Sequence, residues 1–131
     1  MRVALALLVI ALGAGACTPG QHKPSLSEAE GQELRTRLTR NFETVRAYHS
    51  VMIQGQDPCP FAEGVIELAP GLVEDLRETK LLVQPFLDDP KEAPSVASGL
   101  KMLDAWEAEV RDSRDLAFEV LQEQCERKPV R

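Results

Sequence analysis

Three long segments of this chain place apolar residues at intervals of three or four, and this spacing is the strongest constraint on its fold. The first segment has its stripe at Leu34, Leu38, Phe42, Val45, His49 and Met52. The second has its stripe at Val65, Ala69, Leu72, Val73, Leu76, Val83 and Leu87. The third has its stripe at Val96, Leu100, Leu103, Trp106, Val110, Ala117 and Leu121. This period matches one face of an α-helix, and no segment alternates as a half-buried strand does, so the sequence predicts an all-α fold.

Proline, glycine and capping residues set the ends of the three segments. Ser27 and Glu30 have the spacing of a capping box before the first helix, and Ser95 is the expected N-cap of the third. Residues 55–60 (GQDPCP) and 89–94 (DPKEAP) are the expected loops. Because short loops make neighbouring helices antiparallel, we expect an up-down-up antiparallel three-helix bundle over residues 27–131.

Two prolines lie inside the second segment. Pro70, followed by Gly71, lacks the amide donor of a helix interior and can break the helix there, which would give four helices instead of three. Pro85 is expected to kink the same segment near its end.

The first 16 residues have the pattern of a signal peptide. Arg2 supplies the positive charge, and residues 3–12 form an apolar core too short to span a bilayer. The small residues Ala14-Gly15-Ala16 precede Cys17, and this arrangement resembles the lipobox of bacterial lipoproteins. The resemblance implies cleavage between Ala16 and Cys17 and attachment of acyl chains such as palmitate to Cys17. Simple secretion is the alternative, because the tripeptide also fits the ordinary small-x-small cleavage rule.

The residues after the cleavage site fit a membrane anchor. Two or more acyl chains give stable anchoring, and residues 17–26 are polar with two prolines, as in a short tether. Thr18 follows the cysteine; by resemblance to enteric lipoproteins, it favours the outer membrane, facing the periplasm, over the inner membrane.

The cysteine count supports the same interpretation. The chain has three cysteines, and an odd number in an exported protein leaves one thiol to be explained. If Cys17 carries lipid, Cys59 and Cys125 remain to pair in an oxidising compartment. An up-down-up course with helices of matched length would bring these two cysteines to the same end of the bundle.

Composition excludes several classes of function. The chain carries 15 basic and 21 acidic residues, a formal net charge of −6, which argues against nucleic-acid binding. No Glu-x-x-His pair suited to a di-iron bundle and no C-x-x-C-H haem motif occurs. We therefore expect no catalytic residue, no metal and no cofactor.

Two pairs of residues are the candidates for binding. His49 and Arg114 are polar residues near the centres of their helices' apolar faces. They would line a polar pocket for a ligand or a partner's carboxylate, unless Arg114 only donates to carbonyls freed at Pro70. Leu81 and Leu82 project away from the stripe of their helix, so we expect them to be exposed unless the Pro85 kink re-phases the helix. They would then be either a partner contact or ordinary surface leucines.

These features leave two functions open. The first is a non-enzymatic, lipid-anchored envelope module that binds a protein partner, as an assembly factor, adaptor or immunity protein does. The alternative is a helical bundle that binds a small ligand or cofactor around His49 and Arg114.

Overall fold

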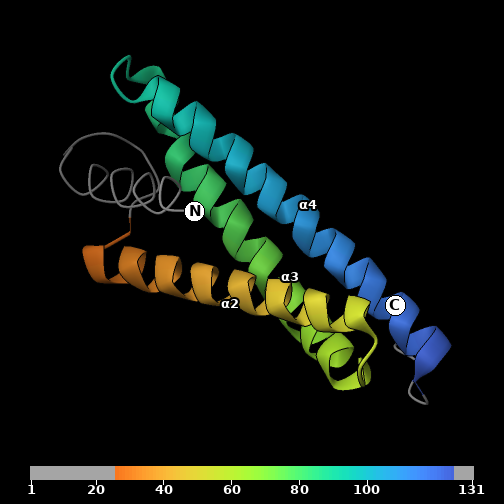
Figure 1. The fold of residues 1–131 in the computed structure, drawn as a ribbon. Helices are drawn as coiled ribbons and strands as arrows, with labels where there is room; N and C mark the ends of the chain where they lie inside the picture. Colours follow the sequence, from red (N-terminus) through yellow and green to blue (C-terminus); the bar gives the residue numbers. More distant parts are fainter. Residues whose placement is uncertain (1–25, 126–131) are drawn as a thin grey trace. The chain divides into compact units, whose positions relative to one another are not determined.

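The chain folds as a helical bundle, which confirms the all-α prediction. The computed structural model describes residues 26–125, and these contain α2 (Glu28–Gln54), α3 (Cys59–Val83), the 3-10 helix η1 (Gln84–Asp88) and α4 (Ala93–Gln124) (Figure 1). Within this range there is no β-strand. The predicted leader, the Cys17 anchor and nearly all of the tether lie outside the described residues.

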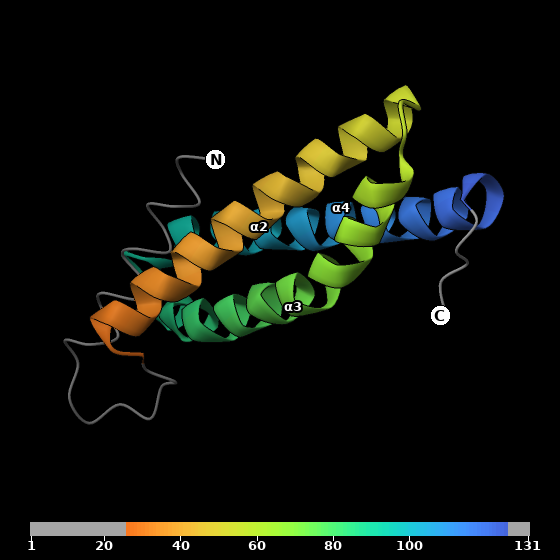
Figure 2. The same cartoon turned by 90° about the horizontal axis from the view of Figure 1, so that it is seen from below.

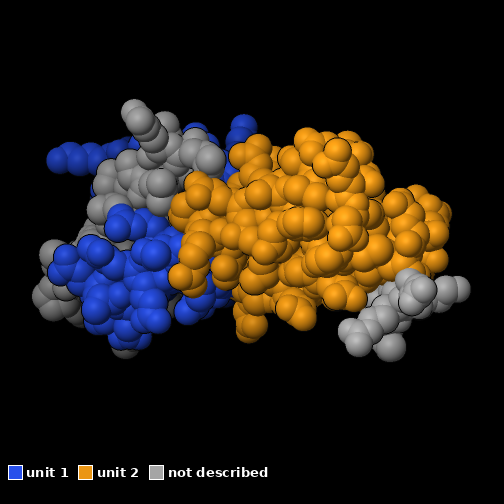
Figure 3. Space-filling model, turned by 60° about the horizontal axis from the view of Figure 1, so that its bottom comes forward, with its two compact units in different colours: residues 1–38, 75–106 blue, residues 39–74, 107–131 orange. Residues whose placement is uncertain are grey.

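The described residues form two compact units, coloured separately in Figure 3. Unit 1 contains residues 26–38 and 75–106, and unit 2 contains residues 39–74 and 107–125. Each unit therefore takes one part of α2, one part of α3 and one part of α4. The buried apolar residues of unit 1 are Leu34, Leu38, Leu76, Leu82, Val83, Phe86, Val96, Leu103 and Trp106. Those of unit 2 are Phe42, Val45, Met52, Ala62, Val65, Ala69, Leu72, Val110, Ala117, Val120 and Leu121.

The start of α2 follows the predicted cap. The amide of Glu30 donates to Ser27 Oγ at 3.2 Å, which satisfies one of the free N–H groups of the first turn. The Glu30 carboxylate accepts from the Ser27 hydroxyl at 2.8 Å, instead of bonding the Ser27 amide as a full capping box would. The predicted stripe of this helix is buried at every position except His49, which is partly exposed.

Helix α3 is continuous through Pro70, so the alternative of a break that gives four helices is wrong. Pro70 and Gly71 are exposed, so Pro70 lies on a face of the helix that points away from the apolar core of unit 2. Ala69 and Leu72, on either side, are fully buried in unit 2. Burial of the flanking apolar residues holds the helix together where one backbone hydrogen bond is lost.

The end of the second segment differs from a simple kink. The α-helix stops at Val83, and Gln84–Asp88 continues as a 3-10 helix with Pro85 in its first turn. A 3-10 helix has three residues per turn, so its winding shifts which side chains face inward. As a result Phe86 is buried, while Leu87, which was expected in the stripe, is 37% exposed.

Helix α4 begins two residues before the expected N-cap. Ser95 lies in the first turn and does not cap it, because the helix starts at Ala93. The carbonyl of Asp89 accepts from the amide of Ala93 at 2.8 Å, so the preceding turn leads directly into the helix. Pro94 occupies an early helix position where its missing N–H has no helical partner to lose.

The predicted pairing of Cys59 with Cys125 is confirmed within unit 2. The two sulfurs are bonded, the Cα atoms lie 5.9 Å apart, and the residues are separated by 66 positions in the chain. Cys59 is the first residue of α3, whereas the sequence had placed it in the preceding loop. The Tyr48 and Phe61 rings of the same unit meet edge to face, with centroids 5.3 Å apart. Figure 2 shows the short connection between α2 and α3.

Candidate functional site

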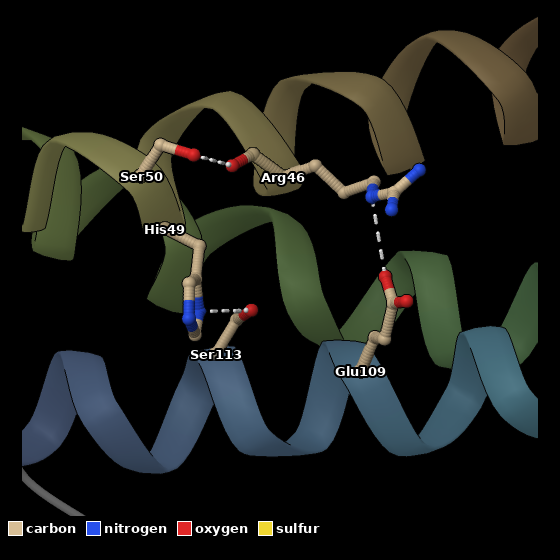
Figure 4. A pocket seen from close by; sticks show the side chains of 5 residues that line it. All are labelled: Arg46, His49, Ser50, Glu109 and Ser113. Atoms are coloured by element: carbon tan, nitrogen blue, oxygen red, sulfur yellow. Dashed lines mark hydrogen bonds and ion pairs between the residues drawn. The ribbon is translucent and has the colours of Figure 1, made fainter. Parts of the chain in front are cut away.

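A polar groove on unit 2 is the candidate functional site. It has a volume of about 470 Å³ and is lined by Arg46, His49 and Ser50 from α2 and by Glu109 and Ser113 from α4. Figure 4 shows His49 and Arg46 reaching from α2 toward Ser113 and Glu109 of α4, while the Ser50 hydroxyl lies along α2. Residues three and four apart lie on one helix face, and this spacing places three α2 side chains and two α4 side chains on one groove.

A hydrogen bond between His49 and Ser113 closes the inner part of the groove. His49 Nδ1 and Ser113 Oγ are 2.8 Å apart (Figure 4). The hydroxyl donates when Nδ1 is unprotonated, and Nδ1–H donates in the other tautomer. Ser113 is buried, so this bond also satisfies a hydroxyl that would be costly to leave unpaired. Among residues 26–125, the hydrogen bond to Ser113 involves only one of the two imidazole nitrogens.

An ion pair lies at the more exposed part of the groove. Arg46 Nε is 3.3 Å from Glu109 Oε2, and the two side chains are 50% and 49% exposed. Pairs this exposed contribute about 0–1 kcal/mol, because solvent screens them. The Arg46 guanidinium also lies over the Phe42 ring, 5.5 Å from its centroid. Arg46 is therefore supported by the ring as well as by Glu109.

The lining has hydrogen-bonding capacity beyond these contacts. A guanidinium has five N–H donors and a carboxylate about four acceptor positions, and one contact between them uses few of these. Ser50, whose hydroxyl donates to the Arg46 carbonyl at 3.3 Å, adds an exposed acceptor. A bound molecule can donate a hydrogen bond to the Glu109 carboxylate, or it can accept one from Arg46 or His49.

The structure brings only one of the two predicted pocket residues into the groove. His49 lines it, but Arg114 does not. The Arg114 side chain is partly exposed, and its Nη2 is 3.8 Å from Asp115. Arg114 was also considered a donor to carbonyls freed at Pro70, but Asp115 is its one ion-pair partner among the described residues, and its buried Nε has no hydrogen-bond partner there.

The sequence pattern selected Arg114 because the centre of the apolar face was taken from residues along the whole third helix. In unit 2, α4 buries Val110, Ser113, Ala117, Val120 and Leu121. At about 100° per residue, Ser113 lies about 30° from the centre of this set and Arg114 about 70° from it. The inward polar position is therefore Ser113, and its spacing of three from Val110 and four from Ala117 was the available signal.

The predicted leucine pair is half wrong. Leu81 is 61% exposed, but Leu82 is only 6% exposed and belongs to the core of unit 1. The buried face of α3 in this unit is centred on Thr79, about 60° from the assumed centre at Leu76. Leu82 therefore faces the core and Leu81 faces away, so the two do not form one patch.

Two polar residues, Asp75 and Thr79, lie in this buried face. Asp75 is 8% exposed and accepts two hydrogen bonds from Arg37, at 2.9 and 3.0 Å. Its backbone carbonyl accepts from the hydroxyl of fully buried Thr79 at 2.8 Å. The Asp75 carboxylate raises the pKa of Arg37, through its hydrogen bonds first and its charge second. This ion pair explains how a polar residue occupies a core position, and we assign it a structural role.

The described residues show neither a metal centre nor a membrane-spanning helix. No cluster of three or more His, Cys, Asp or Glu side chains suited to a metal ion occurs between residues 26 and 125. None of the helices in that range combines the length and the apolar content that crossing a bilayer requires. The chain matches no known protein family, and no curated protein and no solved structure matches it.

Proposed function

We propose that this chain is a lipid-anchored bacterial envelope protein that binds a partner protein, without catalysis, through the polar groove of unit 2. The observation that carries the proposal is the groove itself. Its two charged side chains, Arg46 and Glu109, are half exposed and only weakly paired. Each can therefore leave the other and pair with a charged group of the partner at little cost in free energy. An assembly factor, an adaptor or an immunity protein would use such a surface.

The location in the envelope rests on the leader and the cysteines. Cys17 follows small residues at the end of an apolar leader and is the proposed site of the lipid. The Cys59–Cys125 bond supports folding in an oxidising compartment such as the periplasm. Because Cys59 and Cys125 are bonded to each other, neither of them pairs with Cys17. Thr18 makes the outer membrane the proposed site.

An up-down-up course of the three helices is part of the same proposal. Within unit 2, Arg46 pairs with Glu109 and His49 pairs with Ser113. From the first pair to the second, the residue number rises in α2 and also in α4. This is the pattern expected when the two helices run in the same direction. The bond between the start of α3 and the end of α4 supports an antiparallel α3.

A photo-crosslinking experiment in cells tests partner binding. A photoreactive amino acid placed at Ser50, on the exposed edge of the groove, should yield one adduct of defined mass in the envelope fraction. The matched position is Ser98, which is equally a surface serine but belongs to unit 1 and should give no adduct. An identical pattern at both positions, or no adduct at Ser50, would contradict the proposal.

The anchor has its own test. Cys17→Ser should release the protein from the membrane fraction or block its processing, because the acylated thiol is lost. A variant that fractionates and matures as wild type does would show that the chain is not a lipoprotein.

A small-ligand function is the second candidate, and the groove volume favours it. About 470 Å³ lies within the range of roughly 300–1,000 Å³ that small-molecule sites occupy. Native mass spectrometry of protein purified from the envelope would detect a retained ligand. A bound small molecule that is lost with His49→Ala would favour this function over partner binding.

A further inference from the structure

The charges around the groove indicate what kind of partner it can accept. In unit 2, α4 exposes a series of acidic residues within an arc of about 120° that continues from the groove: Glu109, Asp112, Asp115, Glu119 and Glu123. The two basic residues of this part of α4 are already beside acids. Arg111 lies 3.4 Å from Glu107, and Arg114 lies 3.8 Å from Asp115.

Glu109 belongs both to this acidic face and to the groove. It is the groove's one acidic side chain, and its carboxylate points toward Arg46 (Figure 4). The contact is an ion pair at 3.3 Å between half-exposed groups, so a second cation can replace Arg46 at Glu109 without uncovering a buried charge.

Arg46 can give up Glu109 and keep a favourable position. Its guanidinium lies 5.5 Å from the centre of the Phe42 ring, within the range of a cation–π contact. The ring face still attracts the guanidinium after the carboxylate has moved to another cation. In the free protein Arg46 is therefore the cation paired with Glu109, and a cation that binds Glu109 more tightly displaces it.

Resting on the proposed function, we infer that the partner presents a basic polypeptide segment and that one of its Lys or Arg side chains enters the groove and pairs with Glu109. The acidic face from Glu109 to Glu123 is about 21 Å long. Several positive charges along one chain match that length, whereas a small cation would fill the groove alone. The formal net charge of −6 favours the approach of such a segment and opposes an acidic one.

The test uses a fluorescein-labelled octa-arginine peptide as the probe and fluorescence anisotropy of the mature protein as the readout. Glu109→Gln should weaken binding at least tenfold. Glu119→Gln removes the same charge from the same exposed face outside the groove, and should weaken binding no more than about threefold. Arg46→Gln should strengthen binding several-fold, because the competing internal cation is gone.

Four binding results would each overturn the inference. Equal losses for Glu109→Gln and Glu119→Gln would show diffuse attraction to an acidic protein, not a site. Weaker binding in Arg46→Gln would show that Arg46 does not compete for Glu109. Spermine that binds as tightly as octa-arginine and needs Glu109 equally would make the occupant a small polyamine. Tight binding of octa-glutamate would reverse the required charge.

This inference and the proposed function can fail separately. If the adduct at Ser50 forms but is unaffected by Glu109→Gln, partner binding stands and the basic segment is wrong. If no adduct forms at Ser50, the proposed function fails whatever the peptide affinity. Thermal unfolding of each variant identifies misfolding, and a misfolded protein would not show the gain expected for Arg46→Gln.

Discussion

Removal of the Cys59–Cys125 bond should destabilise the protein strongly. The variant is Cys59→Ala with Cys125→Ala. The bond joins residues 66 positions apart, and the chain-entropy model gives about 4 kcal/mol for a closed loop of that size. For a domain of this size, 1 kcal/mol corresponds to roughly 4–8 °C in the unfolding midpoint. The midpoint should therefore fall by at least about 15 °C.

The surroundings of the two cysteines indicate that the loss of stability would come from the missing cross-link and not from lost packing. Both are partly exposed, so replacement by alanine leaves no closed cavity in the core. Cys59 Sγ has one further polar contact, 3.8 Å from the carbonyl of Gln124, which is too long to contribute much. The loss should come from the greater freedom of the unfolded chain.

Differential scanning calorimetry of the oxidised wild type and the double variant measures the effect, with non-reducing mass spectrometry to establish the bond. Dithiothreitol is the control: it should lower the wild-type midpoint to that of the double variant and leave the variant unchanged. If the oxidised wild type and the variant unfold within about 3 °C of each other, the entropy argument is refuted. Two free thiols in protein isolated from the envelope would refute the pairing itself.

Two further predictions concern matched pairs of substitutions, each followed by chemical denaturation. Leu81→Lys should change the free energy of unfolding by less than about 0.5 kcal/mol, whereas Leu82→Lys, which buries a charge, should cost more than about 3 kcal/mol; equal effects would contradict the assigned burial. Gly64→Ala should destabilise by about 1 kcal/mol, because the new Cβ would lie 2.7 Å from the Tyr48 ring. Gly71→Ala, where no atom lies within 4 Å, should stabilise by about 0.5–1 kcal/mol, and a loss of stability there would contradict the open surroundings.

The candidate site was only partly predictable from the sequence. His49 was identified because a polar residue on an apolar stripe is unusual, and it does line the groove. Arg46 and Glu109 resemble ordinary surface charges in the sequence. They became site residues because α2 and α4 place them 3.3 Å apart. Pairing across two helices depends on their relative rotation, which the pattern of one helix does not contain.

The sequence by itself determined the helical class, the positions of the three helices to within a few residues, and the cysteine pairing. The helices follow from local causes, namely the apolar period and the turn residues between the segments. The pairing was predicted from the odd number of cysteines, with Cys17 assigned to lipid. The tertiary structure decided the positions at which local preference and packing disagree. Pro70 stays helical between the buried Ala69 and Leu72, and Leu82 lies in a core face that also holds Asp75, whose carboxylate is paired with Arg37. Such outcomes depend on partners distant in the chain, and only packing brings those partners together.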